Sequence, residues 1–325
     1  MNQLNRVAIT TGDSDGVGLE ITAKALARVR PQKGTQFYIW RSQRRSLRDL
    51  RLIDRYFKRI TVPDWATAMK SQGDYHQTIV DIESPLPPSY WVEQMARCGL
   101  SGSIDALVTA PLSKTEIARS GLKDKGHTDI LKRICRTPDV FMCFLGKEFN
   151  VVLLSDHVSL KVAYNSITKE RIINCVKHIQ DFKQSLPKAQ QALPIGLIGV
   201  NPHAGEMGII DSKEQDHFVP AIESLTKSKI PIVGPLVGDV CFKREQWRKH
   251  SFYLASYHDQ GLIPFKLVHG ENRGIQLSLG LPFLRASVDH GTAKDIFGKN
   301  RADPSSMQKA ILTTIKQLNK QRISW

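Results

Sequence analysis

Short apolar runs alternate with amphipathic stretches along most of the chain. The runs that predict strands are Val7–Thr10, Phe37–Trp40, Ala106–Thr109, Val140–Leu145, Val151–Leu154, Ile195–Val200 and Ser251–Ser256. The stretches that predict helices are Glu20–Val29, Tyr90–Cys98, Lys169–Ser185, Asp216–Ser228 and Ser305–Asn319. Strands that alternate with helices in this way predict an α/β protein with a mainly parallel sheet flanked by helices.

The composition suits a folded protein of the cytoplasm. With 325 residues the chain is long enough for two domains or one large α/β unit, and 41% hydrophobic residues can fill a sizeable core. No apolar run approaches the roughly 20 residues that cross a bilayer, and the first residues lack the apolar core of a signal peptide. Five scattered cysteines without a CxxC pair predict reduced thiols. We therefore expect a cytoplasmic protein with no membrane partner.

The net charge of +15 has a local source in segment 41–59, which carries eight arginines and lysines against two aspartates. Leu47, Leu50, Ile53 and Phe57 are interleaved with these charges, which predicts an amphipathic helix whose basic face lies in water. No nucleic-acid-binding motif or aromatic stacking platform accompanies the segment, so we expect no nucleic-acid partner. A basic proteome background, or attraction of an anionic, phosphorylated substrate, accounts for the charge more simply.

Three histidines occur in similar contexts in the middle of the chain. His157, His203 and His258 each lie in a short polar turn that follows an apolar, strand-like run. Ligands of α/β proteins gather at the carboxyl ends of parallel strands. One such histidine is more often a loop residue, but three with the same placement favour an open divalent-metal site, which leaves a position for substrate. Zn²⁺ suits three imidazoles, and Mg²⁺ and Co²⁺ are the alternatives.

Other polar motifs also follow predicted strands. The Gly-rich stretch Thr10–Glu20 lacks the GxGxxG fingerprint, so it is a structural turn or an anion cradle and does not predict a conventional Rossmann domain. Thr109–Lys114 and Gly126–Asp129 are either helix caps or contacts to a phosphate or an amino-acid head group. Lys266 and Arg285 stand among apolar runs, where a buried cation needs an anion. We expect a phosphorylated substrate there, with a structural ion pair to Asp239, Asp259 or Asp289 as the alternative.

Five motifs together resemble one known family. They are Thr109-Ala110-Pro111, Gly126-His127-Thr128, and the runs Asn201–Glu206, Tyr257–Gly261 and Gly280–Ala293. On these motifs the chain resembles the 4-hydroxythreonine-4-phosphate dehydrogenase family of pyridoxal phosphate biosynthesis, over essentially its whole length. The resemblance implies NAD-dependent oxidation of 4-phosphooxy-L-threonine to a β-keto acid, which decarboxylates to 3-amino-2-oxopropyl phosphate.

The resemblance also implies an architecture. The family is similar in fold to the isocitrate and isopropylmalate dehydrogenases, which implies two α/β domains with mainly parallel sheets flanked by helices. We expect residues 1–135 and 286–325 to form the first domain and residues 136–285 the second, with the active site in the cleft between them. A homodimer with a shared active site is implied as well.

Site residues follow from the same resemblance. It implies that His157, His203 and His258 bind one divalent metal per subunit (Zn, Mg or Co), with ligands contributed across the dimer interface. The implied substrate contacts are His127, Thr128, Lys266, Gln276 and Arg285. Gly291, Thr292 and Asp295 are implied contacts of NAD (or NADP), and Asp239 and His258 are the implied catalytic residues.

Several positions depart from the family pattern. Ser14-Asp15-Gly16 stands where the family usually has Pro-Ala-Gly, and Gln276 replaces a substrate-binding Asn. These departures leave the predicted metal ligands unchanged but affect the substrate, so the same chemistry on a related phosphorylated hydroxy acid, such as a threonate phosphate, stays open. The three histidines are equally compatible with a metal-dependent hydrolase, and the cationic residues with a non-catalytic phosphometabolite-binding protein.

Overall fold

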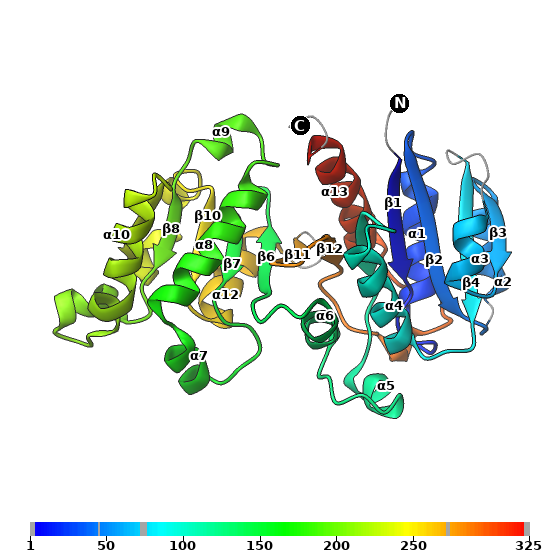
Figure 1. Cartoon of the computed structure of the whole chain (residues 1–325), viewed down its shortest axis with the longest axis horizontal. Helices are drawn as coiled ribbons and strands as arrows, with labels where there is room; N and C mark the ends of the chain where they lie inside the picture. Colours follow the sequence, from blue (N-terminus) through cyan, green and yellow to red (C-terminus); the bar gives the residue numbers. More distant parts are fainter. Residues whose placement is uncertain (1–3, 45, 72–76, 271–273, 322–325) are drawn as a thin grey trace. The chain divides into compact units, whose positions relative to one another are not determined.

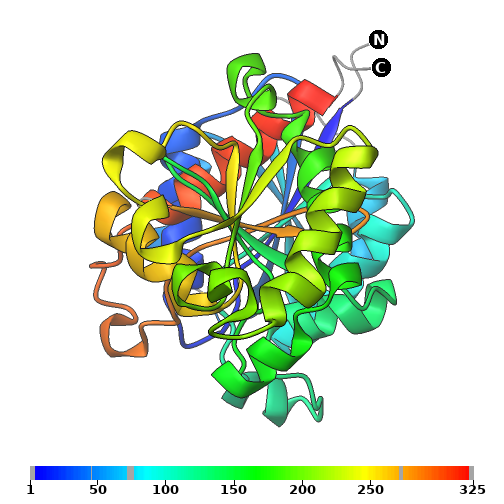
Figure 2. The same cartoon turned by 90° about the vertical axis from the view of Figure 1, so that its left-hand side faces the viewer.

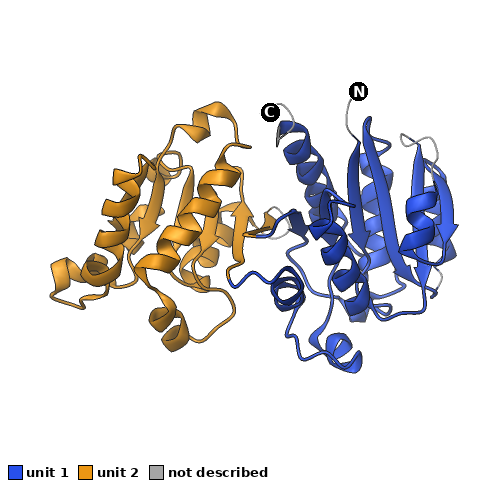
Figure 3. Cartoon of the chain, viewed as in Figure 1, with its two compact units in different colours: residues 1–138, 281–325 blue, residues 139–280 orange. Residues whose placement is uncertain are grey.

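The computed structural model describes residues 4–44, 46–71, 77–270 and 274–321, and it divides the chain into two compact units (Figure 3). Unit 1 comprises residues 1–138 and 281–325, and unit 2 comprises residues 139–280. The predicted boundaries, 135/136 and 285/286, lie a few residues from these. Both units are α/β structures, so the predicted fold class is confirmed.

Unit 1 is built on a parallel sheet with the strand order β3-β4-β2-β1-β5-β12 (Figure 1). The strands are β1 (Asn5–Thr10), β2 (Thr35–Ser42), β3 (Lys58–Val62), β4 (Thr78–Ser84), β5 (Ala106–Thr109) and β12 (Leu284–Ser287). The helices are α1 (Gly18–Val29), α2 (Leu47–Asp54), α3 (Trp65–Lys70), α4 (Pro88–Leu100), α5 (Lys114–Arg119), α6 (His127–Cys135), the 3-10 turn η4 (Lys294–Ile296) and α13 (Ser305–Gln321).

Helices cover both faces of this sheet, which is why its central strands β1 and β5 are almost entirely buried. On one face, Ala8, Tyr38 and Leu107 pack into a core with Trp91 of α4 and Ile130 of α6. On the other, α13 packs on β1, β5 and β12 and contacts α1. The carboxyl ends of β1, β5 and β12 therefore form an edge from which the connecting loops of unit 1 emerge.

Unit 2 has the strand order β11-β6-β7-β10-β8-β9, in which β7, β10, β8 and β9 are parallel and β6 is antiparallel to both of its neighbours. The strands are β6 (Phe141–Leu145), β7 (Val151–Leu153), β8 (Ile195–Ile198), β9 (Ile232–Leu236), β10 (Phe252–Ala255) and β11 (Ile275–Leu279). The helical segments are α7 (Leu160–Ser166), α8 (Lys169–Lys183), α9 (Lys188–Gln191), η1 (Pro202–Gly208), η2 (Glu214–Phe218), α10 (Val219–Lys227), α11 (Gly238–Cys241), η3 (Arg244–Gln246) and α12 (His258–His269).

The strands of unit 2 are also packed between helices. Leu262 and Phe265 of α12 lie in a core with residues of β6, β7 and β10. Helices α8 and α10 contact each other and cover the opposite side (Figure 2). No helix among the described residues is long and apolar enough to cross a membrane.

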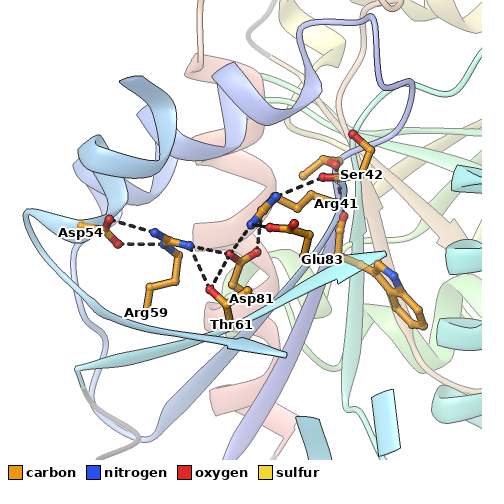
Figure 4. Close-up of polar contacts among 9 residues, drawn as sticks. Arg41, Ser42, Asp54, Arg59, Thr61, Asp81 and Glu83 are labelled. Carbon is orange, nitrogen blue, oxygen red and sulfur yellow. Dashed lines mark hydrogen bonds and ion pairs between the residues drawn. The ribbon is translucent and has the colours of Figure 1, made fainter. Parts of the chain in front are cut away.

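The predicted amphipathic helix over segment 41–59 is confirmed only for α2, where Leu50 and Ile53 are buried and Arg51 is exposed, and it is wrong for the rest of the segment. Arg41 belongs to β2 and is buried, where its Nε and Nη2 donate to Asp81 of β4 at 2.8 Å and Nη2 also donates to Glu83 at 2.6 Å (Figure 4). Arg59, in β3, binds both Asp54 of α2 and Asp81. Helix formation is confined to α2, because parallel pairing of β2, β3 and β4 places these charges side by side within the sheet. Residue 45 lies outside the described residues.

Candidate functional site

The three histidines follow three strands that are neighbours in the sheet of unit 2. His157 comes after β7, His258 opens α12 directly after β10, and His203 lies in η1 after β8. Because β7, β10 and β8 are parallel and adjacent, their carboxyl ends lie at one edge. The fold therefore brings the three segments to the same edge of unit 2.

His157 and His258 are close together. Their ring centroids lie 5.0 Å apart and the ring planes are tilted by 42°. Two imidazoles that bind one tetrahedral Zn²⁺ through bonds of about 2.1 Å have centroids roughly 5 Å apart, because each centroid lies about 3.2 Å from the ion. This pair of side chains fits two ligands of a single metal.

The Asp259 carboxylate orients the ring of His258. The distance between His258 Nδ1 and Asp259 Oδ1 is 2.7 Å. A carboxylate on one nitrogen fixes the tautomer of an imidazole and raises the basicity of the other nitrogen, as is typical of metal-binding histidines. The Nε2 atom of His258 is then the nitrogen available to bind a ligand.

His203 does not join this pair within the chain. The described residues contain no group of three His, Cys, Asp or Glu side chains that could hold one metal ion. His203 is exposed, and it begins a run of left-handed residues that extends to Met207. A single copy of the chain thus assembles two of the three predicted ligands.

Two serines and a glutamine hold the strand ends in register. Ser256 Oγ donates to the carbonyl of Ile198 at 3.0 Å, and Ser155 Oγ donates to the carbonyl of Ser256 at 2.9 Å. Gln260 accepts from Ser256 N at 2.7 Å and donates to the carbonyl of Gly199 at 2.8 Å. These contacts tie the ends of β7, β10 and β8 to one another.

Arg171 of α8 supports the end of β7. Its Nε and Nη2 donate to the carbonyl of Leu154 at 3.0 and 2.8 Å, and its Nη1 donates to Asp139 at 2.6 Å. The sequence patterns placed Gln260 in the Tyr257–Gly261 motif without a role, and they assigned no role to Arg171, Ser155 or Ser256. A signal for the serines exists, because each stands two residues before a histidine of the pair.

Asp239 and Gln276 also lie in unit 2. Asp239 is exposed in the short helix α11, which packs beside η1, and the neighbouring Gly238 lies beside Gln260. Asp239 therefore belongs to the same edge as the histidines. Gln276 is half-buried in β11, opposite Phe144 of β6.

Lys266 is exposed near the end of α12, between the exposed Ile263 and Leu267. The expectation that it is a buried cation next to a strand is wrong, because residues 258–269 form a helix and this position faces solvent. Its contact with substrate stays a prediction.

The predicted substrate residues of unit 1 do cluster. Arg285 of β12 is buried and donates from Nη2 to Thr109 Oγ1 of β5 at 2.8 Å. Burial lowers the pKa of Arg285 to about 10. Burial, and then the positive charge of Arg285, lower the pKa of His127 to about 3, and the Nε2 atom of His127 is buried without a hydrogen-bond partner among the described residues.

His127 and Thr128 are the first two residues of α6. The backbone N–H groups of a helix's first turn are not bonded within the helix and attract anions. A neutral imidazole, a buried guanidinium and this helix end together favour a phosphate.

The predicted cofactor loop is attached to the Gly-rich turn after β1. The carbonyl of Thr292 accepts from Val17 N at 3.0 Å, and Lys294 Nζ lies 3.1 Å from Asp13 Oδ2 and 2.7 Å from Asp15 Oδ1. Gly291 and Asp295 of this loop are exposed. At Gly12, which has φ +66°, a Cβ would lie 1.9 Å from the Pro111 carbonyl oxygen, so only glycine fits this turn.

Comparison with known proteins assigns the chain to a family. The profile of the family described as "Pyridoxal phosphate biosynthetic protein PdxA" matches residues 89–314, which is well over half of the chain. The chain belongs to this family. The family is one of dehydrogenases, and the resemblance inferred from the five motifs is confirmed.

Relatives within the PdxA family match nearly the whole chain. The 4-hydroxythreonine-4-phosphate dehydrogenase of Sulfurihydrogenibium sp. is 35% identical over 319 residues, which cover 94% of this chain and 96% of that protein. A protein of Oceanobacillus iheyensis that carries the name of a D-threonate 4-phosphate dehydrogenase is 38% identical over 217 residues, which cover 66% of this chain and 64% of that protein.

Solved structures agree with this assignment. The crystal structure of a 4-hydroxythreonine-4-phosphate dehydrogenase from Burkholderia phymatum has a TM-score of 0.78 and 28% identity, and the match covers 97% of this chain and 98% of that one. A β-decarboxylating dehydrogenase from Thermococcus kodakarensis, at 13% identity and a TM-score of 0.57, shares the fold and covers 97% of this chain and 84% of that one.

Proposed function

We propose that the chain is an NAD-dependent dehydrogenase that oxidises 4-phosphooxy-L-threonine to a β-keto acid, which decarboxylates to 3-amino-2-oxopropyl phosphate in pyridoxal 5'-phosphate biosynthesis. The match along 94% of the chain to a relative named for this activity carries the proposal. The geometry of both units supports it, because unit 2 holds a pair of imidazoles and unit 1 holds a group suited to a phosphate.

The metal site is proposed to consist of His157, His203 and His258, with one Zn²⁺, Mg²⁺ or Co²⁺ per subunit. The 5.0 Å separation of two of these rings supports it. A metal held by these residues would supply Lewis-acid chemistry at the oxygens of the reacting substrate. Asp259 holds His258 in one tautomer, and the exposed Asp239 carboxylate, proposed with His258 as catalytic, is the candidate to take up the hydroxyl proton.

The phosphate of the substrate is proposed to bind His127, Thr128 and Arg285, with Lys266 and Gln276 as further substrate contacts. The buried Nε2 of His127 and the buried Arg285 support this role, because a phosphate offers both groups an acceptor. Positioning by these residues fixes the substrate for hydride transfer. Gly291, Thr292 and Asp295 are proposed to contact NAD, or NADP.

A homodimer is proposed to complete the site. Large apolar side chains are exposed on the segments that begin at the histidine edge, notably Met207 and Ile209 after β8, Leu160 in α7 and Leu267 in α12. Met207 is 84% exposed and Leu267 80% exposed, which favours burial by a second copy. Because His203 lies in the same loop as Met207, a second copy that buries Met207 would also lie next to His203. Five free cysteines support a cytoplasmic location.

A second substrate is supported by one relative, which is named for D-threonate 4-phosphate and is 38% identical over part of the chain. Gln276, which replaces the Asn usual in the family, is the residue that would favour a substrate with a different head group. The deciding experiment incubates the purified protein with NAD, a divalent metal and each of the two phosphorylated compounds. We expect NADH absorbance with 4-phosphooxy-L-threonine. NADH only with threonate phosphate would reassign the substrate, and phosphate release without NADH would support a hydrolase.

A further inference from the structure

The loop that carries His203 has an unusual backbone. Five consecutive residues, from His203 to Met207, have φ between 46° and 76°. Left-handed conformations are unfavourable for residues with a Cβ, and Gly205 is the single glycine within this run. A loop of this shape persists only where surrounding contacts determine it.

The side chain at the centre of these contacts is Glu214. It is completely buried, and its two carboxylate oxygens accept hydrogen bonds from a single residue at the start of the loop. Asn201 N donates to Oε1 at 2.8 Å and Asn201 Nδ2 donates to Oε2 at 2.9 Å. A buried carboxylate with N–H donors on both oxygens is a strong, directional contact.

The loop is also shaped to accommodate this carboxylate. A Cβ at Gly205 would lie 2.7 Å from Glu214 Oε2, and a Cβ at Gly199 would lie 3.2 Å from Oε1. The absence of side chains at these two glycines lets the backbone close around the carboxylate. Glu214 opens the π-helical turn η2, an element that is rare overall and found frequently at functional sites.

A second contact holds the other end of the loop. Asp211 accepts from the Tyr164 hydroxyl at 2.6 Å and from Lys213 N at 2.8 Å. This contact fixes residues 211–213 next to η2, and Asp211 also receives a hydrogen bond from the Asn201 side chain. Glu214 is the buried carboxylate that holds both the backbone and the side chain of Asn201, so its loss should release the loop at the histidine end.

We propose that Glu214 is a positioning residue that holds loop 201–208 in the conformation that presents His203 to the metal. The proposal rests on the proposed function in so far as His203 is a ligand. It assigns to a buried carboxylate, thirteen residues from its partner, a role that neither the family match nor the metal-ligand motif specifies.

The test replaces Glu214 by Gln, which keeps its size but gives one oxygen position a donor that faces the donors of Asn201. Glu223→Gln on the exposed face of α10 is the matched control. Cobalt titration followed by visible absorption measures metal affinity, and hydrogen exchange of the peptide that spans residues 201–210 measures loop order. We expect Glu214→Gln to weaken Co²⁺ binding by about tenfold or more and to accelerate exchange in this peptide, and Glu223→Gln to change neither.

A double variant separates positioning from general damage. If Glu214 acts through His203, adding Glu214→Gln to His203→Ala weakens Co²⁺ binding no further, because the ligand is already absent. If each substitution weakens Co²⁺ binding and the two factors multiply in the double variant, the proposal is overturned. Unchanged exchange and unchanged Co²⁺ affinity in Glu214→Gln would also overturn it while leaving the metal site intact.

The outcomes also separate this inference from the proposed function. If the wild-type protein binds no Co²⁺, the metal site fails, and hydrogen exchange alone decides whether Glu214 orders the loop. If Glu214→Gln does not fold, Asn201→Ala removes the 2.9 Å bond but retains the one from the backbone. Faster hydrogen exchange of residues 203–208 in that variant supports the positioning role of Glu214, and unchanged hydrogen exchange refutes it.

Discussion

Gln260 donates its side-chain amide to the carbonyl of Gly199 at 2.8 Å, and so joins the start of α12 to the end of β8. Its Oε1 atom simultaneously accepts from Ser256 N at 2.7 Å. The segment that carries His258 and the segment that leads to His203 are thereby linked by one side chain two residues from His258. Position 260 consequently requires both a donor and an acceptor.

Gln260→Glu should destabilise unit 2, because a carboxylate still accepts from Ser256 but repels the Gly199 carbonyl. We expect a loss of about 1–3 kcal/mol in the free energy of unfolding, measured by urea denaturation. Gln215→Glu, at an exposed position, is the control and should change the free energy of unfolding by less than about 0.5 kcal/mol. Equal values for the two variants would contradict a linking role for Gln260.

Mixing of inactive variants should reveal which ligands share a chain. Because His157 and His258 lie together in one chain, a mixture of His157→Ala and His258→Ala should stay inactive. A mixture of His203→Ala and His157→Ala should recover up to about a quarter of wild-type activity, since half of randomly paired dimers contain one complete site. NADH formation after subunit exchange is the measurement. A wild-type protein that sediments as a fully active monomer would rule out the shared site.

Arg285→Met should impair substrate binding more than folding. We expect kcat/KM to fall by about 100-fold or more with an unchanged or slightly raised melting temperature, because a buried charge is removed. Lys266→Met, at an exposed position, should leave melting unchanged and raise KM. Early melting of Arg285→Met with near-normal kinetics in the folded fraction would instead show that Arg285 is structural.

The free energy of unfolding should fall in acid partly because of His127. Its pKa is about 3 in the folded protein, whereas an unfolded histidine has a pKa of about 6.5. Below about pH 6.5 the unfolded chain binds the additional proton, so stability decreases as the pH falls, by up to about 1.4 kcal/mol per pH unit. Urea denaturation at about pH 7 and about pH 5 should show a smaller decrease in His127→Gln. Inorganic phosphate should also reduce the decrease, since an anion stabilises the protonated imidazole. An equal decrease in both proteins would contradict the assignment.

Asp81→Asn should destabilise unit 1 strongly. Asp81 is buried and receives hydrogen bonds from both Arg41 and Arg59, so its neutralisation leaves the Arg41 charge with less compensation. Breaking such a buried pair costs about 3–5 kcal/mol. Asp54→Asn, which affects the exposed end of the same network (Figure 4), should cost about 1 kcal/mol or less. Thermal and urea denaturation of both variants compare the two costs.

The fold could be predicted where burial makes a strand apolar. Ala106–Thr109 is β5 with the predicted bounds, and the helices Tyr90–Cys98 and Lys169–Ser185 correspond to α4 and α8. Strands β3 and β4 escape prediction, because polar residues such as Arg59 and Asp81 interrupt their apolar pattern. Their charges are compensated by residues that are distant in sequence, and no local periodicity contains that information.

The site could be predicted only in part for the same reason. Because each histidine follows a predicted strand, the sequence indicates that all three lie at one edge of a sheet. The structure places His157 beside His258 at that edge of unit 2. The contacts that support the edge join residues far apart in sequence, such as Ser155 with Ser256 and Gln260 with Gly199. The expected buried environment of Lys266 is wrong because an apolar run of this length is equally compatible with a strand and with a helix, and a proline within it does not exclude a helix.

The bridge from Lys294 to Asp13 and Asp15 bears on how this protein can be re-engineered. The carboxylates belong to the turn after β1 and the ammonium group to the loop after β12. The charges of each segment are therefore neutralised only when the other segment is present. A chimera that imports the Pro-Ala-Gly turn usual in the family would leave Lys294 with one carboxylate, and one that imports another cofactor loop would leave two carboxylates without their cation. The two loops should therefore be transplanted together, as a pair of parts separated by more than 270 residues of sequence that behaves as one exchangeable module.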